Sequence, residues 1–168
     1  MSSRREIREL ALQTLYQLDA RGEGDREQID QSVQEAPFTP QVREQAAELA
    51  EQAWRHREAA DQLIGELAPD WPTHRQPLVD RNLLRLGYYE LVSRRSPVAV
   101  AINEAVEIAK RYGSDRSPAF INGVLDRIDK RLREQARSEP QPPDAAAEKP
   151  STGDDWLDDA LQDRRPEQ

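Results

Sequence analysis

Three helical patterns follow one another between Leu78 and Ile128, and they limit what this chain can fold into. In each pattern apolar side chains recur at steps of mainly three and four residues, which places them on one face of a helix. Strict alternation of apolar and polar residues, the sign of a half-buried strand, is absent. Helices joined by short links pack as a bundle, so the sequence predicts an all-α fold. The apolar positions are Val79, Leu83, Leu86 and Leu91, then Val98, Ile102, Val106 and Ala109, then Ile121, Val124, Leu125, Ile128 and Leu132.

Capping residues mark the expected helix ends. Ser96 and Ser117 each precede a proline, and we expect both serines to cap the helices that follow. Gly113 follows the second pattern, where we expect a left-handed residue to end the helix. Earlier in the chain, Thr39 followed by Pro40 predicts the start of another helix.

Three polar or aromatic residues stand out against this apolar pattern. Asn103 and Asn122 interrupt two of the apolar helices, and we expect their amides to form buried hydrogen bonds that fix how these helices pack. Trp71 lies in a short link between two prolines, and we expect its ring to plug the bundle.

An arginine stripe lies on the first predicted helix, residues 3–20. At about 100° per residue, Arg5, Arg8, Leu12 and Tyr16 share one face, and Arg4 lies beside them. Guanidinium groups that hold phosphates, followed by a ring that stacks on a base, are typical of single-stranded RNA binding. A solvated helix face with pairs such as Arg5–Glu9 gives the same pattern, and the residues alone leave both interpretations open.

Four segments of the chain resemble the NusB family of bacterial transcription antitermination factors, and the likeness extends over about residues 1–132. The resemblance implies two packed helical sub-bundles, no enzyme activity, and binding of boxA RNA together with the ribosomal protein that acts as NusE. The segments are Arg4 to Tyr16, Asp80 to Leu91, Pro97 to Lys110, and Phe120 to Asp126.

The same resemblance assigns candidate site residues and partners. It implies RNA binding by Arg4, Arg5, Arg8, Tyr16 and Phe120, and contact with the protein partner by Tyr16, Asp80 and Phe120. Phe120 is then expected at the surface. The wider assembly would be an RNA polymerase antitermination complex, and the protein itself would be a monomer or a homodimer.

Charge and composition divide the chain into a helical domain, residues 1–135, and a tail, residues 136–168. The net charge is −8, and the tail holds nine acidic and four basic residues, so the domain is only weakly acidic. The tail is rich in proline and acids and is expected to be disordered. Its segment from Asp154 to Leu161 contains Trp156 and could form a short interaction motif or a transient helix; we also consider that the tail competes weakly with RNA.

Several kinds of chemistry are not expected. The chain has no cysteine, which excludes disulfides and thiolate sites, and it has no phosphate loop or paired metal-binding motif. We therefore expect no catalytic residue, no metal and no cofactor, and we expect a cytoplasmic protein without a membrane span. A methyltransferase that carries a related RNA-binding domain is excluded because it needs a catalytic cysteine. A protein-binding helical scaffold without RNA affinity remains the alternative function.

Overall fold

The computed structural model describes residues 3–139, which form seven α-helices and no strand, so the predicted all-α fold is confirmed for this part of the chain. Two short 3-10 turns, Glu23–Asp25 and Thr73–Arg75, lie in the links. The tail beyond residue 139, with its Trp156 segment, lies outside the described residues. The helices are α1 (Ser3–Arg21), α2 (Arg26–Gln34), α3 (Pro40–Arg55), α4 (Arg57–Leu67), α5 (Leu78–Ser93), α6 (Val98–Tyr112) and α7 (Ser117–Ser138).

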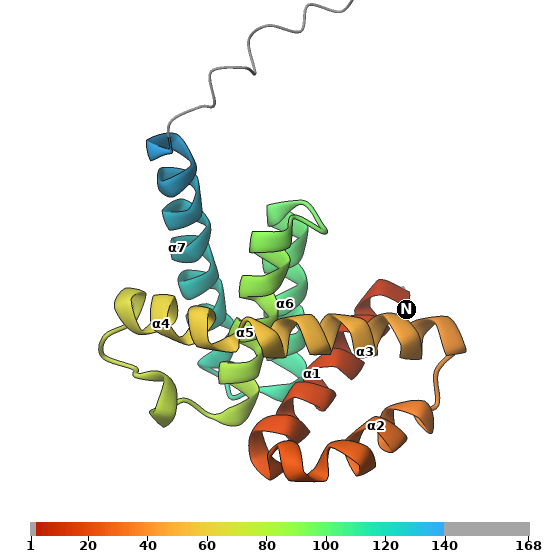
Figure 1. Cartoon of the computed structure of the whole chain (residues 1–168). Coiled ribbons are helices and arrows are strands. Elements are labelled where there is room, and N and C mark those ends of the chain that lie inside the picture. Colours follow the sequence, from red (N-terminus) through yellow and green to blue (C-terminus); the bar gives the residue numbers. More distant parts are fainter. Residues whose placement is uncertain (1–2, 140–168) are drawn as a thin grey trace, which may run out of the picture. The chain divides into compact units, whose positions relative to one another are not determined.

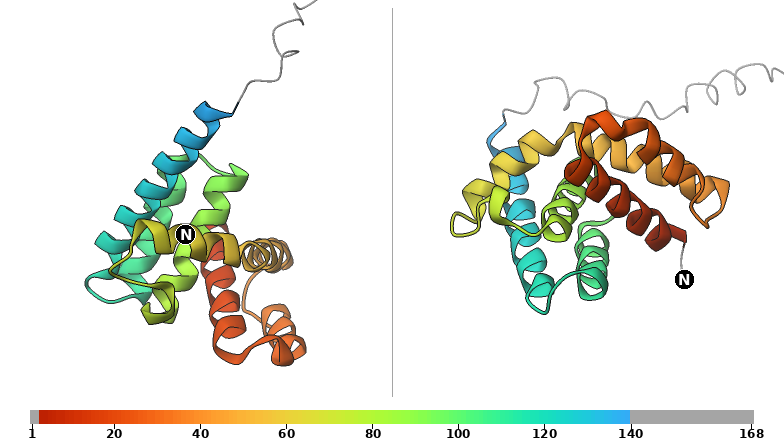
Figure 2. Two further views of the ribbon diagram at one scale, coloured as in Figure 1. Left: turned by 60° about the vertical axis from the view of Figure 1, so that its left-hand side comes forward. Right: turned by 90° about the horizontal axis from the view of Figure 1, so that it is seen from below.

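The helices form two groups that meet at α5 (Figure 1). In the first group α1 packs against α2 and α3, and in the second α5, α6 and α7 lie side by side (Figure 2). Helix α4 follows α3 after a break at His56 and packs against α5. Because α5 also contacts α1 and α3, it joins the two groups into one body.

In α5 and α7 the core lies where the apolar patterns predict it. Leu83, Leu84, Leu125 and Ile128 are at most 1% exposed and belong to one cluster that also includes Leu15 of α1. Burying one such side chain contributes roughly 1.5–3 kcal/mol. A smaller cluster of Leu10, Val33 and Ala46 holds α2 and α3 against α1. The periodicity thus located the helices and the buried faces of α5 and α7. The face predicted for α6 is wrong: Val98 is 37% exposed and Ile102 and Val106 are only half-buried, whereas the small side chains of Ala101 and Ala105 pack against the core together with Ile108.

The predicted caps are only partly correct. Thr39 caps α3 as expected, since its hydroxyl accepts a hydrogen bond from the Val42 amide at 3.3 Å. The cap prediction for Ser96 is wrong, because its hydroxyl accepts a hydrogen bond from Arg8 at 3.1 Å. Ser117 is already helical, and its hydroxyl accepts from the Ser114 amide at 2.9 Å. Each serine hydroxyl thus accepts its hydrogen bond from a donor outside the helix that the serine was predicted to cap.

Gly113 ends α6 in an extended conformation (φ −91°, ψ −170°), so the predicted left-handed end is wrong. Its lack of a side chain serves a different purpose. A Cβ atom at this position would lie 2.5 Å from the Ser117 hydroxyl. Glycine therefore permits the close approach of Ser117 that shapes the tight α6–α7 link.

The predictions for Asn103, Asn122 and Trp71 are also wrong. Both asparagines are exposed, Asn103 on α6 and Asn122 on α7. Asn103 is exposed because the buried face of α6 is formed by Ala101 and Ala105, and Asn103 is about 200° around the helix from each. The Trp71 ring is 53% exposed. The Trp71 amide donates to the Ala68 carbonyl at 3.1 Å, which closes a turn that holds the ring outside the core.

The contact between Gly87 of α5 and Leu125 of α7 provides a test of this packing. A Cβ atom on Gly87 would lie 2.7 Å from Leu125 Cδ2, and Leu125 is fully buried. We expect Leu125→Ala to lower the free energy of unfolding by about 2–5 kcal/mol. Gly87→Ala should cost about 1 kcal/mol, since overpacking outweighs the usual gain of alanine over glycine in a helix. In the Leu125→Ala background the same change should be neutral or stabilising.

The measurement is urea unfolding of the two single variants and the double variant. Gly123→Ala in α7 is the matched control, because a Cβ atom there has nothing within 4 Å. It should stabilise the protein by roughly 0.5–1 kcal/mol. Additive effects of the Gly87 and Leu125 substitutions would contradict the close contact.

Candidate nucleic-acid interface

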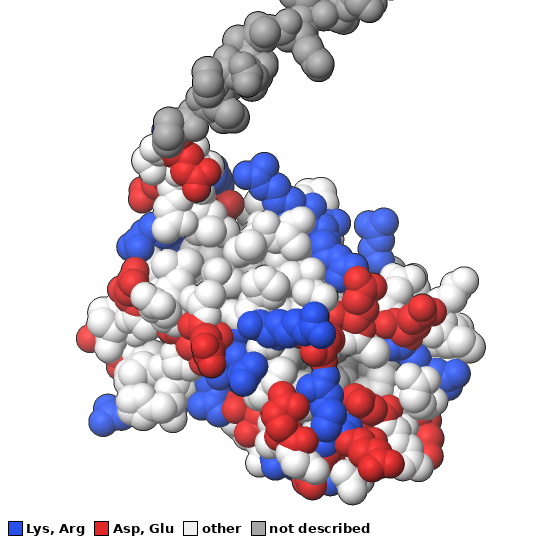
Figure 3. Space-filling model, in the orientation of Figure 1, with Lys and Arg blue, Asp and Glu red and all other residues white. Residues whose placement is uncertain are grey.

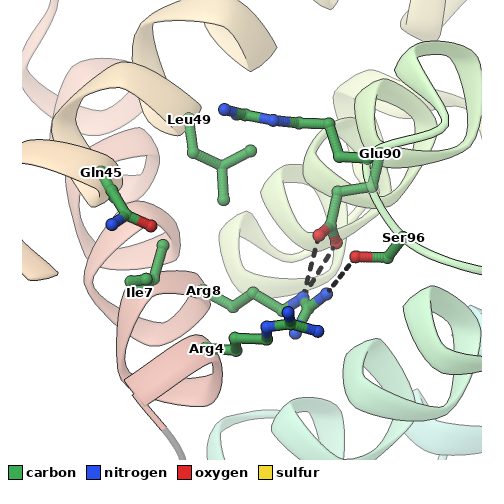
Figure 4. Close-up of a pocket in the computed structure, with 8 residues that line it drawn as sticks. Arg4, Ile7, Arg8, Gln45, Leu49, Glu90 and Ser96 are labelled. Atoms are coloured by element: carbon green, nitrogen blue, oxygen red, sulfur yellow. Dashed lines mark hydrogen bonds and ion pairs between the residues drawn. The ribbon is translucent and has the colours of Figure 1, made fainter.

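A basic hollow lies beside the first two turns of α1 (Figure 4). Helix α1, helix α3, the end of α5 and the α5–α6 link form its walls. Three of its lining side chains are arginines, and the only carboxylate among them is that of Glu90. We call this site the basic hollow; it is lined by Arg4, Ile7, Arg8, Gln45, Leu49, Glu90, Arg95 and Ser96.

Arg8 lies at the bottom of the basic hollow and is only 4% exposed. Its Nε atom donates to Glu90 Oε1 at 2.9 Å, and its Nη2 atom donates to the Ser96 hydroxyl at 3.1 Å (Figure 4). Glu90 is equally buried, and burial raises the pKa of its carboxyl group while the Arg8 guanidinium opposes that rise. The charge of Arg8 is therefore balanced inside the protein, and the residue joins α1 to α5 and to the α5–α6 link.

Arg5 forms a two-pronged pair with Glu104 of α6. Arg5 Nε and Nη2 donate to Glu104 Oε2 and Oε1 at 2.8 and 3.0 Å, and this pair lowers the pKa of the Glu104 carboxyl group. The Arg5 side chain is 36% exposed, so solvent screens the pair. The Arg5–Glu9 pair of the alternative interpretation is not formed, since Arg5 binds Glu104 and Glu9 binds Arg111 at 3.0 Å. Two arginines of the stripe thus bind carboxylates of other helices.

Arg4 and Arg95 are the cations of the basic hollow that solvent can reach. Arg4 is exposed and has no ion pair or hydrogen bond within residues 3–139. Arg95 is 39% exposed and its Nη2 atom lies 3.6 Å from the Glu48 carboxylate, which is itself 59% exposed. Sequence reasoning missed Arg95. Its signal was a pair of adjacent arginines, Arg94 and Arg95, directly after a predicted helix.

Tyr16 lies further along α1, in a hollow of its own. The ring is 42% exposed and faces the same hollow as Leu12, Val79 of α5 and Tyr112 of α6. We call this site the tyrosine hollow. The surface that it presents is largely apolar with two tyrosine hydroxyls, which suits a protein contact or stacking on a base.

Asp80 and Phe120 share a third hollow with the exposed ring of Trp71, which we call the tryptophan hollow. Asp80 is 6% exposed, its Oδ1 atom has no hydrogen-bond partner, and burial raises the pKa of its carboxyl group. Phe120 is half-buried and packs against the core, so only part of its ring is at the surface. Arg75 and Arg116 also line this hollow.

The predicted site residues are therefore brought together in three places. Arg4 and Arg8 line the basic hollow, Tyr16 lines the tyrosine hollow, and Asp80 and Phe120 line the tryptophan hollow. Val79 of the tyrosine hollow and Asp80 of the tryptophan hollow are adjacent residues in the first turn of α5. Arg5 lies one residue from Arg4 but binds α6.

Charge is unevenly distributed over the surface (Figure 3). In the view of Figure 3, basic side chains gather around the upper ends of α5 and α6, whereas acidic and basic side chains alternate over α1, α2 and α3. Local fields rather than net charge decide where an anion binds. Within residues 3–139 no cluster of acids and histidines could hold a metal ion, and no helix has the length and apolar character needed to cross a membrane.

Comparisons with known proteins agree on one family. A model of the NusB family matches residues 5–130. The transcription antitermination protein NusB of Trichlorobacter lovleyi is 41% identical over 140 residues, which covers 83% of this chain and 99% of that protein. The crystal structure of T. maritima NusB is similar with a TM-score of 0.67 and 35% identity, covering 77% of this chain and 92% of that one.

A second similar structure contains partners. One chain of a crystal structure of the antitermination factors NusB and NusE in complex with dsRNA is similar with a TM-score of 0.68 and 32% identity. The likeness covers 78% of this chain and 98% of that chain.

Removing Arg8 should destabilise the fold, because the buried Glu90 carboxylate loses its partner. We expect Arg8→Ala to lower the free energy of unfolding by about 3–5 kcal/mol near neutral pH, because an unpaired charge is left in the interior. Burial makes the pKa of Glu90 higher in the folded state than in the unfolded state, and loss of Arg8 raises it further. The stability linked to Glu90 is thus present below its unfolded pKa and lost as the pH rises through its folded pKa.

The loss of unfolding free energy caused by Arg8→Ala should therefore become smaller as the pH falls and Glu90 takes up a proton. Urea unfolding across the acid-to-neutral range measures it. Arg8→Ala with Glu90→Gln should recover much of the loss, and Arg5→Ala, in a solvent-screened pair, should change stability little. A deficit that is the same at every pH would show that an unpaired Glu90 charge is not its cause.

Proposed function

Because this chain belongs to the NusB family, we propose that it is a non-enzymatic antitermination factor that binds boxA-type single-stranded RNA together with a NusE-type ribosomal protein. The action that we propose is in transcription of ribosomal RNA, within an RNA polymerase antitermination complex. The observation that carries the proposal is the basic hollow on a fold that matches a protein in complex with NusE and dsRNA. Single-stranded RNA is our choice because exposed aromatic rings accompany the arginines.

RNA binding would begin at the N-terminal end of α1. Arg4 is free to contact a phosphate, and Arg5 could exchange the screened Glu104 carboxylate for one. Arg8 would contribute by holding α1 in place, since its own guanidinium group is buried. Tyr16 and Phe120 would stack on bases further along the strand, where stacking tolerates different sequences.

The protein partner would contact the tyrosine hollow and the tryptophan hollow beside the stacked bases. Tyr16, Asp80 and Phe120 line these two hollows. Apolar rings surrounded by polar groups are typical of the buried centre of a protein interface. The unpartnered Asp80 Oδ1 atom would accept a hydrogen bond from the partner or from a base.

The alternative is a helical scaffold that binds protein but has no affinity for RNA. The exposed tyrosine and tryptophan hollows alone would suit it. The free Arg4 and the basic hollow favour the RNA-binding function, since a purely protein-binding surface does not need them. Binding of a boxA-containing RNA with and without the NusE-type partner separates the two functions, with the duplex form of the same RNA as a further comparison.

Charge removal at Arg4 and Arg5 should weaken RNA binding without unfolding the protein. We expect Arg4→Gln with Arg5→Gln to lower the affinity for the boxA RNA by tenfold or more at low salt. The slope of log K against log salt should become shallower by about 0.7 for each phosphate contact that is lost. Fluorescence anisotropy at several salt concentrations measures both quantities.

The matched control is Lys130→Gln with Arg131→Gln, which removes the same charge from an exposed and a half-buried position on α7, neither of which lines any of the three hollows. This control should leave affinity and slope nearly unchanged. Equal losses in the two double variants would indicate a general effect of net charge instead of contacts at α1.

Phe120→Ala should separate binding from stability. If the ring stacks on a base, its removal should cost about 1–3 kcal/mol of RNA affinity, which is about a 5- to 150-fold loss. The free energy of unfolding should fall less than for Leu125→Ala, because Phe120 is only half-buried. Unfolding like that of Leu125→Ala, with RNA affinity unchanged in the folded fraction, would make Phe120 a core residue.

A further inference from the structure

The basic hollow contains a cation that the arginine stripe of α1 does not include. We propose that Arg95, together with Arg4, holds a backbone phosphodiester group of the bound RNA in this hollow, and that Arg8 and Ser96 are positioning residues for Arg95. This inference rests on the proposed function and adds a contact outside α1. It concerns a phosphodiester of RNA and not a free phosphate ion.

The charges of the hollow favour an anion. Arg4, Arg8 and Arg95 line it, and only Arg8 has a buried carboxylate partner, Glu90. Two positive charges therefore remain facing solvent from two different elements, the first turn of α1 and the α5–α6 link. Two guanidinium groups that approach one anion from different sides can each donate hydrogen bonds to separate phosphate oxygens.

Arg95 can leave its present partner at little cost. Its Nη2 atom lies 3.6 Å from the Glu48 Oε1 atom, which is longer than a hydrogen bond, and both side chains are well exposed. An exposed pair of this kind contributes little because solvent and salt screen it. Arg95 is thus available to an incoming phosphate, as Arg4 is.

The floor and back of the hollow hold Arg95 in place. Arg8 Nη2 donates to the Ser96 hydroxyl at 3.1 Å, so the buried Arg8–Glu90 pair fixes the residue next to Arg95. Ile7 and Leu49 supply apolar walls, which strengthen an ionic contact by excluding water. Gln45 adds an amide that can donate to a further oxygen.

Neighbouring arginines provide a matched test. Arg95→Gln and Arg94→Gln remove the same charge from adjacent positions in one link, but Arg94 lines a different hollow with Leu132 and Arg133. We expect Arg95→Gln to lower the affinity for a boxA RNA about tenfold at low salt and to reduce the salt slope by about 0.7. Arg94→Gln should change affinity less than twofold. Equal effects of the two substitutions would overturn the proposal.

The positioning role needs a separate readout. Ser96→Ala should lower RNA affinity by a few-fold in the wild-type background and have no further effect when Arg95 is already Gln. Glu48→Gln, which removes the carboxylate beside Arg95, should raise affinity. If Ser96→Ala lowers affinity equally in both backgrounds, the residue supports the fold generally and does not act through Arg95.

Two further outcomes separate the inference from its alternatives. If the wild-type protein binds no RNA with or without the partner, the proposed function fails and this inference fails with it. If the protein binds RNA but Arg95→Gln matches Arg94→Gln, only the inference fails. Replacing chloride by inorganic phosphate at equal ionic strength should preserve the difference between the variants, whereas its loss would indicate a site for free phosphate and overturn the assignment to RNA.

Discussion

Buried and half-buried ion pairs join helix α5 to α1 near both of its ends, and the positions of the surface residues depend on them. Near the end of α5, Glu90 binds Arg8 with both side chains 5% exposed. Near its start, Arg81 and Arg85 both approach Asp19 of α1, at 2.7 and 3.2 Å, and Arg85 also binds Asp61 of α4 at 2.7 Å. Such pairs need not stabilise a fold relative to apolar contacts, because both charges are desolvated. They do penalise any shift of one helix along the other, since a shift would leave charges buried without partners.

These pairs also fix the direction of the two helices. Residue 8 of α1 meets residue 90 of α5, and residue 19 meets residues 81 and 85, so the helices run antiparallel. The first turn of α1 therefore lies beside the α5–α6 link, where Arg95 follows α5. Tyr16 lies beside the first turn of α5, where Val79 and Asp80 border the other two hollows. The antiparallel packing of α1 and α5 thus places the basic hollow at the first turns of α1 and the tyrosine hollow further along the same helix.

Sequence periodicity predicted the elements well because burial of apolar faces decides them. Leu83, Val124, Leu125 and Ile128 are all core residues, as their spacing indicates. The position of a polar side chain depends on what meets it from elsewhere, and no helical wheel contains that information. On a helical wheel Arg8 belongs to the exposed stripe. In the structure it is buried, because it pairs with the Glu90 carboxylate, which lies 82 positions away in the chain.

The same reason explains the errors at the helix ends. Ser96 has the local pattern of a cap, but the Arg8 guanidinium group, a stronger donor brought in by tertiary packing, takes its hydroxyl. Gly113 has the local pattern of a left-handed helix end. Glycine is needed there because Ser117 occupies the space of a Cβ atom, and not because the backbone adopts a positive φ. For the site, the chemistry of Arg4, Tyr16, Asp80 and Phe120 was visible in the sequence with the help of the family resemblance. Their division among three hollows, and the contribution of Arg95, required the fold.

The separation of the two ends of α1 has a consequence for how RNA and a protein partner would bind together. Tyr16 follows Arg4 by twelve positions, which is about 18 Å along the helix. A partner on the tyrosine hollow would then leave the basic hollow uncovered, and one RNA strand could contact both the basic hollow and the partner. Because the net charge of the chain is −8, we expect RNA binding by the chain alone to be weak. The partner would add a second set of RNA contacts at high effective concentration, so cooperativity would need no change in the conformation of the bundle.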